Sequence, residues 1–234
     1  MSRYAAIQEA CREANTRLPA LGLVDLTFGN VSVADRDLGV MAIKPSGVDY
    51  AELRADDIVV LDLESGSVVE GNLRPSSDTP THRRLFLAFP NARSVVHTHS
   101  RNAVAFAQAG REIPCLGTTH ADYFRGPVPV TRPLASSESG NDYEWETGNV
   151  IVERFRTLHP DEISAVLVRG HGPFTWGPSP AKAVETALAL ELVAGMARDS
   201  LLLNPACSPL PEYLRDRHYL RKHGPGAYYG QQGR

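Results

Sequence analysis

The order of apolar and polar residues predicts helices that alternate with short strands. Apolar side chains recur at helical spacing over residues 4–18, and Pro19 is expected to end that helix. Short apolar runs follow, bounded by glycine, proline or polar residues, and each is typical of a β-strand. These runs lie at residues 28–33, 40–43, 58–61, 67–69, 94–99 and 165–168. The first four follow one another through short connections, which favours an antiparallel sheet that contains a hairpin.

Capping signals predict the helices between and after these strands. Residues 76–80 combine capping side chains with a proline in the first turn, so we expect a helix that runs to about Phe89. Ser179 and Pro180 predict the start of the longest helix, which would run to about residue 203. Further helices are expected at residues 101–108 and 143–155, and an extended segment at 126–131. The sum is an α/β fold, in which helices cover a mostly antiparallel sheet.

Length and composition exclude several classes of protein. A chain of 234 residues is expected to form a single domain over residues 1–234. Its net charge of −3 and the lack of a basic run give no electrostatic case for a nucleic-acid partner. No apolar stretch approaches the roughly 20 residues that span a bilayer, and the N-terminus lacks the pattern of a signal peptide. Cys11, Cys115 and Cys207 are far apart and odd in number, which favours reduced thiols and a cytoplasmic location.

Two histidines at the end of the fifth strand are the first candidates for chemistry. Alternate residues of a strand point to one face, so His97 and His99 are expected to point the same way. A catalytic zinc ion usually takes three protein ligands, although such a pair also occurs as ordinary histidines at a strand end. His171 favours the metal site, because it too follows an apolar strand and is flanked by glycines that permit close approach.

Other candidate residues stay open between a structural and a functional interpretation. Asp78 lies at a predicted helix start, where a capping role is favoured over that of a fourth metal ligand or an acid–base group. At His120, a hydrogen-bonded loop histidine is favoured over a metal ligand. Asp122 and Tyr229 are plausible proton donors and acceptors if the fold brings them to the metal.

Three loops that precede the histidines offer groups suited to an anion. Residues 29–30 supply a backbone and a side-chain amide, and residues 44–47 supply a lysine, a hydroxyl and a permissive glycine. Ser76 and Ser77 lie at a predicted helix N-terminus, where free N–H groups favour a phosphate. Each loop alone is more often a simple turn, but together they predict a phosphorylated small substrate. Neither GxGxxG nor a Walker A motif is present, so nothing indicates a nucleotide.

Longer motifs in these regions are similar to those of a known family. They cover residues 28–32, 43–50, 75–82, 96–100 and 170–173. This set resembles the class II aldolase/adducin family, and the resemblance extends over nearly the whole chain. Three more motifs resemble those of family members that epimerise pentulose 5-phosphates at C4, namely residues 117–123, 143–150 and 218–230.

The resemblance implies a fold, an activity and a site. The fold would be the three-layer class II aldolase-like fold, and the activity the metal-dependent interconversion of L-ribulose 5-phosphate and D-xylulose 5-phosphate, as in arabinose catabolism. Zn²⁺, or another divalent ion, would bind His97, His99 and His171, with Asp78 beside it. Asp122 and Tyr229 would be the acid–base pair and would come from a neighbouring subunit of a homotetramer. The substrate would contact Asn30, Lys44, Ser46, Gly47, Ser76, Ser77, Thr118, Glu144 and His218.

Two positions distinguish this chain within the family. The sugar-phosphate aldolases typically carry Glu where Asp78 stands, and the shorter Asp would suit an enzyme that does not protonate the intermediate. Similar epimerases often carry His where Arg169 stands, whereas the expected ligand His171 is retained. Two alternatives remain: an aldolase that releases both fragments, and a non-catalytic adducin-like binding module without metal. A zinc hydrolase ranks last, because no HExxH-type base is present.

Overall fold

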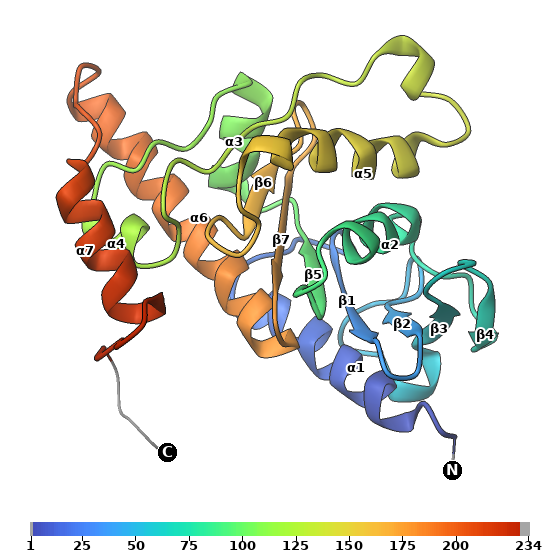
Figure 1. Cartoon of the computed structure of the whole chain (residues 1–234). Coiled ribbons are helices and arrows are strands. Elements are labelled where there is room, and N and C mark those ends of the chain that lie inside the picture. Colours follow the sequence, from blue (N-terminus) through green and yellow to red (C-terminus); the bar gives the residue numbers. More distant parts are fainter. Residues whose placement is uncertain (1, 230–234) are drawn as a thin grey trace.

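Seven strands form one sheet at the centre of the molecule (Figure 1). The computed structural model describes residues 2–229, so the end of the motif at 218–230 lies outside the described residues. The strands are β1 (Asn30–Asp35), β2 (Val40–Ile43), β3 (Val59–Asp62), β4 (Val68–Glu70), β5 (Ser94–His97), β6 (Ala165–Leu167) and β7 (Pro173–Gly177). Their order in the sheet is β4-β3-β2-β1-β5-β7-β6, and every neighbouring pair is antiparallel.

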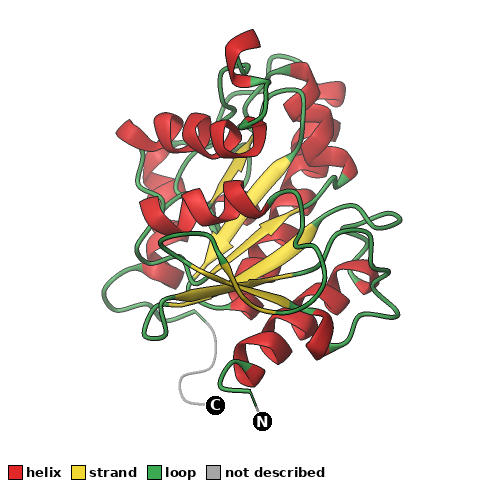
Figure 2. Cartoon of the chain, turned by 90° about the vertical axis from the view of Figure 1, so that its right-hand side faces the viewer, coloured by secondary structure: helices red, strands yellow, loops and turns green. Residues whose placement is uncertain are grey.

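Helices cover both faces of this sheet, as Figure 2 shows. The α-helices within residues 2–229 are α1 (Ala5–Ala20), α2 (Thr79–Ala88), α3 (Arg101–Ala109), α4 (Thr118–Ala121), α5 (Tyr143–Arg154), α6 (Pro180–Leu203) and α7 (Glu212–His223). Consecutive residues of β5 show the layering, because Val95 packs in the core beneath α2 and α5, whereas Val96 packs beneath α1 and α6. The central strands are therefore buried on both faces, and the predicted three-layer α/β fold is confirmed.

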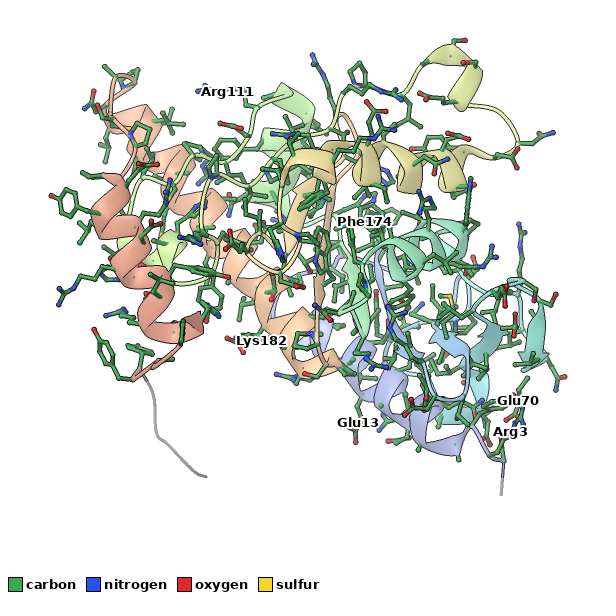
Figure 3. All side chains as sticks on the ribbon, in the orientation of Figure 1. Arg3, Glu13, Glu70, Arg111, Phe174 and Lys182 are labelled. Carbon is green, nitrogen blue, oxygen red and sulfur yellow. The ribbon has the colours of Figure 1, made fainter. Side chains whose placement is uncertain are left out.

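The register of the central strands determines where the first histidine lies. In β5, His97 is paired with Asn30 of β1 on one side and with Phe174 of β7 on the other. Its imidazole stacks on the ring of Phe174, with centroids 4.2 Å apart, and Phe174 lies between sheet and helices (Figure 3). The histidine thus has a packed apolar wall behind it.

Most predicted elements are confirmed, with shifts of one or two residues at their ends. The helix signal at 76–80 is confirmed, since α2 begins at Thr79 with Pro80 in its first turn. The longest helix also begins as predicted, with the Ser179 hydroxyl accepting the N–H of Lys182. The hairpin of β3 and β4 is present.

Several expectations about the elements were wrong. Pro19 does not itself end the first helix, which includes it and continues one residue further, to Ala20. The extended segment expected at 126–131, by contrast, is confirmed, since Val128 and Val130 form single β-bridges with Ile113 and Leu167. The strand β7 and the helices α4 and α7 were missed. The sequence of β7 contains a proline and a glycine, and α4 is only one turn long, so neither has a clear periodic signal.

The three cysteines are free, as predicted. Cys11 lies on the buried face of α1, and burial raises the pKa of its thiol. None of the helices within residues 2–229 has the length and apolar content needed to cross a membrane.

Candidate active site

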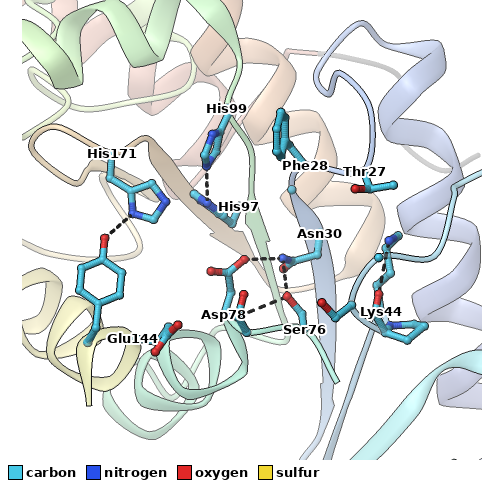
Figure 4. Close-up of a pocket in the computed structure, with 16 residues that line it drawn as sticks. Thr27, Phe28, Asn30, Lys44, Ser76, Asp78, His97, His99, Glu144 and His171 are labelled. Atoms are coloured by element: carbon cyan, nitrogen blue, oxygen red, sulfur yellow. Dashed lines mark hydrogen bonds between the residues drawn. The ribbon is translucent and has the colours of Figure 1, made fainter. Parts of the chain in front are cut away.

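Three histidines converge at one end of the sheet (Figure 4). His97 is the last residue of β5, His99 follows two residues later, and His171 lies in the turn between β6 and β7. One nitrogen from each imidazole lies within 4.8 Å of the other two, and the Nε2 atoms of His97 and His99 are 3.1 Å apart. The prediction that the ends of two separate strands bring three imidazoles close together is therefore confirmed.

Two glycines permit this convergence. Gly29 has a φ of 80°, and a Cβ there would lie 2.8 Å from the carbonyl oxygen of His97. A Cβ on Gly172 would lie 2.9 Å from the carbonyl oxygen of Thr98 and would also touch the rings of His97 and His99. Any larger residue at either position would push apart the backbone segments that carry the imidazoles.

Hydrogen bonds orient two of the three rings. Nδ1 of His97 lies 2.9 Å from the carbonyl oxygen of Pro173, and because a carbonyl can only accept, Nδ1 must carry the proton. Nε2 is then left with a free lone pair. The hydroxyl of Tyr143 lies 3.4 Å from Nδ1 of His171, as the dashed line in Figure 4 marks. Such partners fix the orientation of metal-binding imidazoles.

Burial disfavours the charged form of His99 and His171. It lowers the pKa of His171 to about 4, with a further contribution from the neighbouring His97 and His99. Burial lowers the pKa of His99 as well. Neutral imidazoles whose nitrogens face one point suit a divalent metal, because only the unprotonated nitrogen can act as a ligand. The donor set thus fits such an ion.

Asp78 occupies the N-cap position of α2 but does not cap the helix with its side chain. No hydrogen bond runs from its carboxylate to the first turn; instead, Oδ2 accepts a 2.7 Å hydrogen bond from Nδ2 of Asn30. Burial opposes its ionisation, but the fields of His97 and His82 and the hydrogen bond from Asn30 outweigh it and lower the pKa of this carboxyl. The favoured capping interpretation was wrong, and the carboxylate faces the pocket.

The pocket beside the histidines has a volume of about 420 Å³ and brings together eleven of the predicted residues. We call it the histidine pocket. These eleven are Asn30, Lys44, Ser46, Gly47, Ser76, Ser77, Asp78, His97, His99, Glu144 and His171. Four more residues line it that the sequence did not single out, namely Thr27, Phe28, Pro45 and Tyr143. Pro45 and Tyr143 directly neighbour predicted residues, and Thr27 and Phe28 lie within three positions of Asn30, so closeness in the chain was the available signal.

Lys44 provides the positive charge of this pocket. The residue is only 2% exposed, and its Nζ makes one long hydrogen bond, 3.4 Å, to the carbonyl oxygen of Pro45. Burial lowers its pKa, which the nearby Asp49 partly opposes. The side chains of Ser76 and Asn30 are hydrogen-bonded to each other on the facing wall. A buried ammonium with vacant donor positions is suited to an anionic ligand.

The remaining predicted residues form a second group, between α4 and α7. Asp122 ends the turn of α4, and its carboxylate contacts His218 (3.1 Å), Arg221 (2.8 Å) and Lys222 (3.8 Å) from α7. The ring of Tyr229 packs on Arg221 and Lys222, each 4.6 Å from its centroid. We call these five residues the Asp122 cluster. None of them lines the histidine pocket of the same chain.

Sequence reasoning missed Arg221 and Lys222. With His218 they are spaced by three and four residues, which puts all three on one face of a helix. This spacing is visible in the C-terminal sequence, but it indicates a shared face only once that segment is assigned to a helix. Thr118, also predicted at the site, is the first residue of α4, and its carbonyl accepts the N–H of Asp122.

Two further expectations have clear outcomes. His120 lies in α4, and its Nε2 donates to the carbonyl oxygen of Gly126 at 2.7 Å, so the hydrogen-bonded interpretation is confirmed and it is not part of the histidine triad. Arg169 does not line the pocket, and its guanidinium lies against Gly110 at the end of α3. The departure at Arg169 therefore leaves the pocket itself intact.

Comparison with known proteins agrees with this geometry. A family model described as the class II aldolase and adducin N-terminal domain matches residues 9–197. The chain belongs to this family. L-ribulose-5-phosphate 4-epimerase UlaF of Salmonella paratyphi B is 50% identical over 220 residues, which cover 94% of this chain and 96% of that protein.

Solved structures of the class II aldolase family share the fold. An L-fuculose 1-phosphate aldolase superposes with a TM-score of 0.78 at 23% identity and covers 93% of this chain and 95% of its own. The L-fuculose-1-phosphate aldolase of Thermus thermophilus has a TM-score of 0.67 at 28% identity, over 86% of this chain and 98% of that one. The class II aldolase fold implies a divalent metal, and His97, His99 and His171 form a cluster that fits one.

Proposed function

We propose that this chain is an L-ribulose-5-phosphate 4-epimerase, which interconverts L-ribulose 5-phosphate and D-xylulose 5-phosphate. The observation that carries the proposal is the histidine pocket, where three imidazoles with converging nitrogens lie in the same cavity as the buried ammonium of Lys44. One end suits a metal and the other suits a phosphate. The 50% identity to an L-ribulose-5-phosphate 4-epimerase over nearly the whole chain supports the choice of substrate.

The position of the inverted carbon explains why an aldolase fold is suited to an epimerase. The hydrogen on C4 is not next to the C2 carbonyl, so removing it as a proton would leave an unstabilised carbanion. Cleavage of the C3–C4 bond instead places the charge on C3, delocalised into the C2 carbonyl as an enediolate. The other fragment, glycolaldehyde phosphate, turns its aldehyde face and is attacked again by C3.

A divalent metal, which we propose to be zinc, would supply Lewis-acid stabilisation of that negative charge when bound by the three histidines. The protein supplies the anchor for the fragment that turns. Lys44, Ser46 and Gly47 on one loop, with Asn30, Ser76 and Ser77 opposite, would hold the phosphate while the aldehyde rotates. Asp78 would remain an ionised carboxylate beside the metal, held by Asn30.

Proton transfer at the C4 hydroxyl calls for two further groups. The hydroxyl loses its proton when C3–C4 breaks and regains one from the opposite face, so an acid–base group is needed on each side. We propose Asp122 and Tyr229 for these roles, with Thr118, Glu144 and His218 nearby. Since the Asp122 cluster does not line the pocket of its own chain, it would come from a neighbouring copy in a cytoplasmic homotetramer.

The test is to incubate metal-analysed protein with L-ribulose 5-phosphate and to follow D-xylulose 5-phosphate and free glycolaldehyde phosphate separately. We expect the epimer without free aldehyde, and loss of activity on chelation that zinc restores. Accumulating aldehyde would assign the chain to the aldolases. No product with metal bound would refute this substrate, and no product without metal binding would favour a non-catalytic binding module.

A further inference from the structure

Behind the phosphate end of the histidine pocket lies a buried tyrosine that the proposed reaction does not use. Tyr50 is 5% exposed and does not line the cavity. It lies in the loop that leaves the pocket after residues 44–47. Burial, with a smaller contribution from the charge of Asp78, raises the pKa of its hydroxyl, so the group stays a hydrogen-bond donor at physiological pH.

The hydroxyl of Tyr50 holds the backbone that enters β1. It lies 2.6 Å from the carbonyl oxygen of Gly29 and 2.9 Å from that of Phe28. Gly29 has the left-handed φ of 80° and directly precedes Asn30, whose side chain contacts Ser76 and Asp78. The one hydroxyl proton therefore anchors the segment that places Asn30 at the pocket.

The ring of Tyr50 faces the ammonium of Lys44. Nζ lies 4.8 Å from the ring centroid, within the range of a cation–π contact, and its hydrogen bond to Pro45 is long. Within residues 2–229, no carboxylate forms an ion pair with Lys44. An aromatic face stabilises the buried cation without neutralising it, so the positive charge remains available to an incoming anion.

We propose that Tyr50 is a positioning residue for the phosphate end of the pocket, because it fixes the ammonium of Lys44 with its ring and the Phe28–Gly29 backbone with its hydroxyl. The two walls of the pocket belong to different strands, and Tyr50 contacts both. Its substitution changes the affinity for the phosphate group and leaves the metal site intact. This inference rests on the proposed function only in taking the anion to be a sugar phosphate.

The experiment measures two affinities on metal-loaded protein: that for inorganic phosphate by calorimetry and that for the metal by competition with a chelator. Tyr50→Phe retains the ring and loses the hydroxyl, whereas Tyr50→Leu loses both. We expect phosphate affinity to fall about tenfold in Y50F and further in Y50L, with KM for L-ribulose 5-phosphate rising more than kcat falls. Tyr4→Phe is the matched control, a buried tyrosine whose hydroxyl is hydrogen-bonded only to Arg3 among residues 2–229, and it should change neither affinity.

Three results would overturn the role of Tyr50. These are unchanged phosphate affinity in Y50F, an equal loss of phosphate and metal affinity, and no phosphate binding by the unaltered protein. Y50F alone decides the matter if Y50L fails to fold. Because inorganic phosphate is the probe, a protein that binds phosphate but does not convert L-ribulose 5-phosphate would refute the proposed function and still test Tyr50.

Discussion

The histidine pocket and the Asp122 cluster are both built from ionisable side chains, but by opposite physical means. In the pocket, burial lowers the pKa of His99 and that of His171, the latter to about 4, and so favours neutral imidazoles. In the cluster, three basic side chains surround one carboxylate at the edge of the fold. The pocket is thus prepared for a metal and an anion from outside, whereas the cluster already contains its own counter-charges.

The two regions also differ in what holds them in place. The pocket lies at the ends of β1, β2, β5 and the β6–β7 turn, and the starts of α2 and α5 complete it, so the central sheet and its adjacent helices determine its geometry. The cluster depends on the contact between one helical turn, α4, and the C-terminal helix α7, at the left of Figure 1. Under the proposed function we therefore expect one chain to supply the metal and phosphate ends, and a second chain to supply the proton-transfer groups.

The largest effect is expected from loss of one imidazole of the pocket. His171→Asn removes a ligand without adding charge or bulk. We expect metal affinity and turnover to fall by more than about a hundredfold. Loss of a residue that only hydrogen-bonds to a metal ligand already costs up to about a hundredfold, and loss of the ligand itself should cost more. Metal content after dialysis and epimerase assay measure both quantities. His159→Asn changes an exposed histidine that does not line the pocket, and this variant should retain metal and activity.

A change in the Asp122 cluster should separate activity from metal binding. Tyr229→Phe removes only the hydroxyl, and we expect turnover to fall about a hundredfold, as is typical of lost acid–base catalysis, at unchanged metal content. Steady-state kinetics and metal analysis of the same preparation provide the measurement. The neighbouring Tyr228→Phe serves as the control and should behave as the parent. Full turnover in Y229F would remove Tyr229 from the mechanism.

Mixing the two inactive variants tests whether each site takes its parts from two chains. If His171→Asn and Tyr229→Phe subunits reassemble at random after joint dissociation, roughly one site in four combines an intact pocket with an intact cluster. We therefore expect about a quarter of the parental activity to return. A mixture of His171→Asn with His97→Asn should stay inactive. No recovery in the first mixture would place both regions in one subunit.

The smallest effect concerns stability towards acid. His82 is fully buried beneath the pocket beside Ser32, and burial lowers its pKa from 6.5 to about 3. The unfolded chain takes up a proton on this residue below pH 6.5 and the folded chain does not, so stability is lost as pH falls from 6.5. Between pH 7 and 5 this amounts to about 2 kcal/mol.

Urea unfolding at both pH values, at one protein concentration, measures this loss. His82→Gln should lose about 2 kcal/mol less than the parent on acidification. As a control, Asp122→Asn should change the free energy of unfolding by the same amount at pH 7 and at pH 5. The contacts with Arg221 and His218 outweigh burial and lower the pKa of Asp122, so this carboxylate stays ionised at both pH values. An equal pH dependence in His82→Gln and the parent would contradict the assignment.

Local sequence determined the elements that carry a strong periodic or capping signal. The start of α2 at Thr79, the hairpin of β3 and β4 and the strand that ends at His97 all follow from residues close in the chain. The same is true of the loops that line the pocket, since glycine, serine and lysine in short turns have recognisable roles. Weak elements such as β7 were missed, because tertiary contacts and not periodicity stabilise them.

The sequence by itself therefore determined which residues bear the chemistry, and the tertiary structure decided which of them meet. Asp78 shows the difference: its position at a helix start favoured a cap, but pairing across the sheet brings Asn30 to its carboxylate and turns it towards the pocket. Asp122 shows it again, because only the packing of α7 on α4 reveals its three basic partners. Contacts between residues distant in the chain depend on strand order and helix packing, which no local pattern encodes.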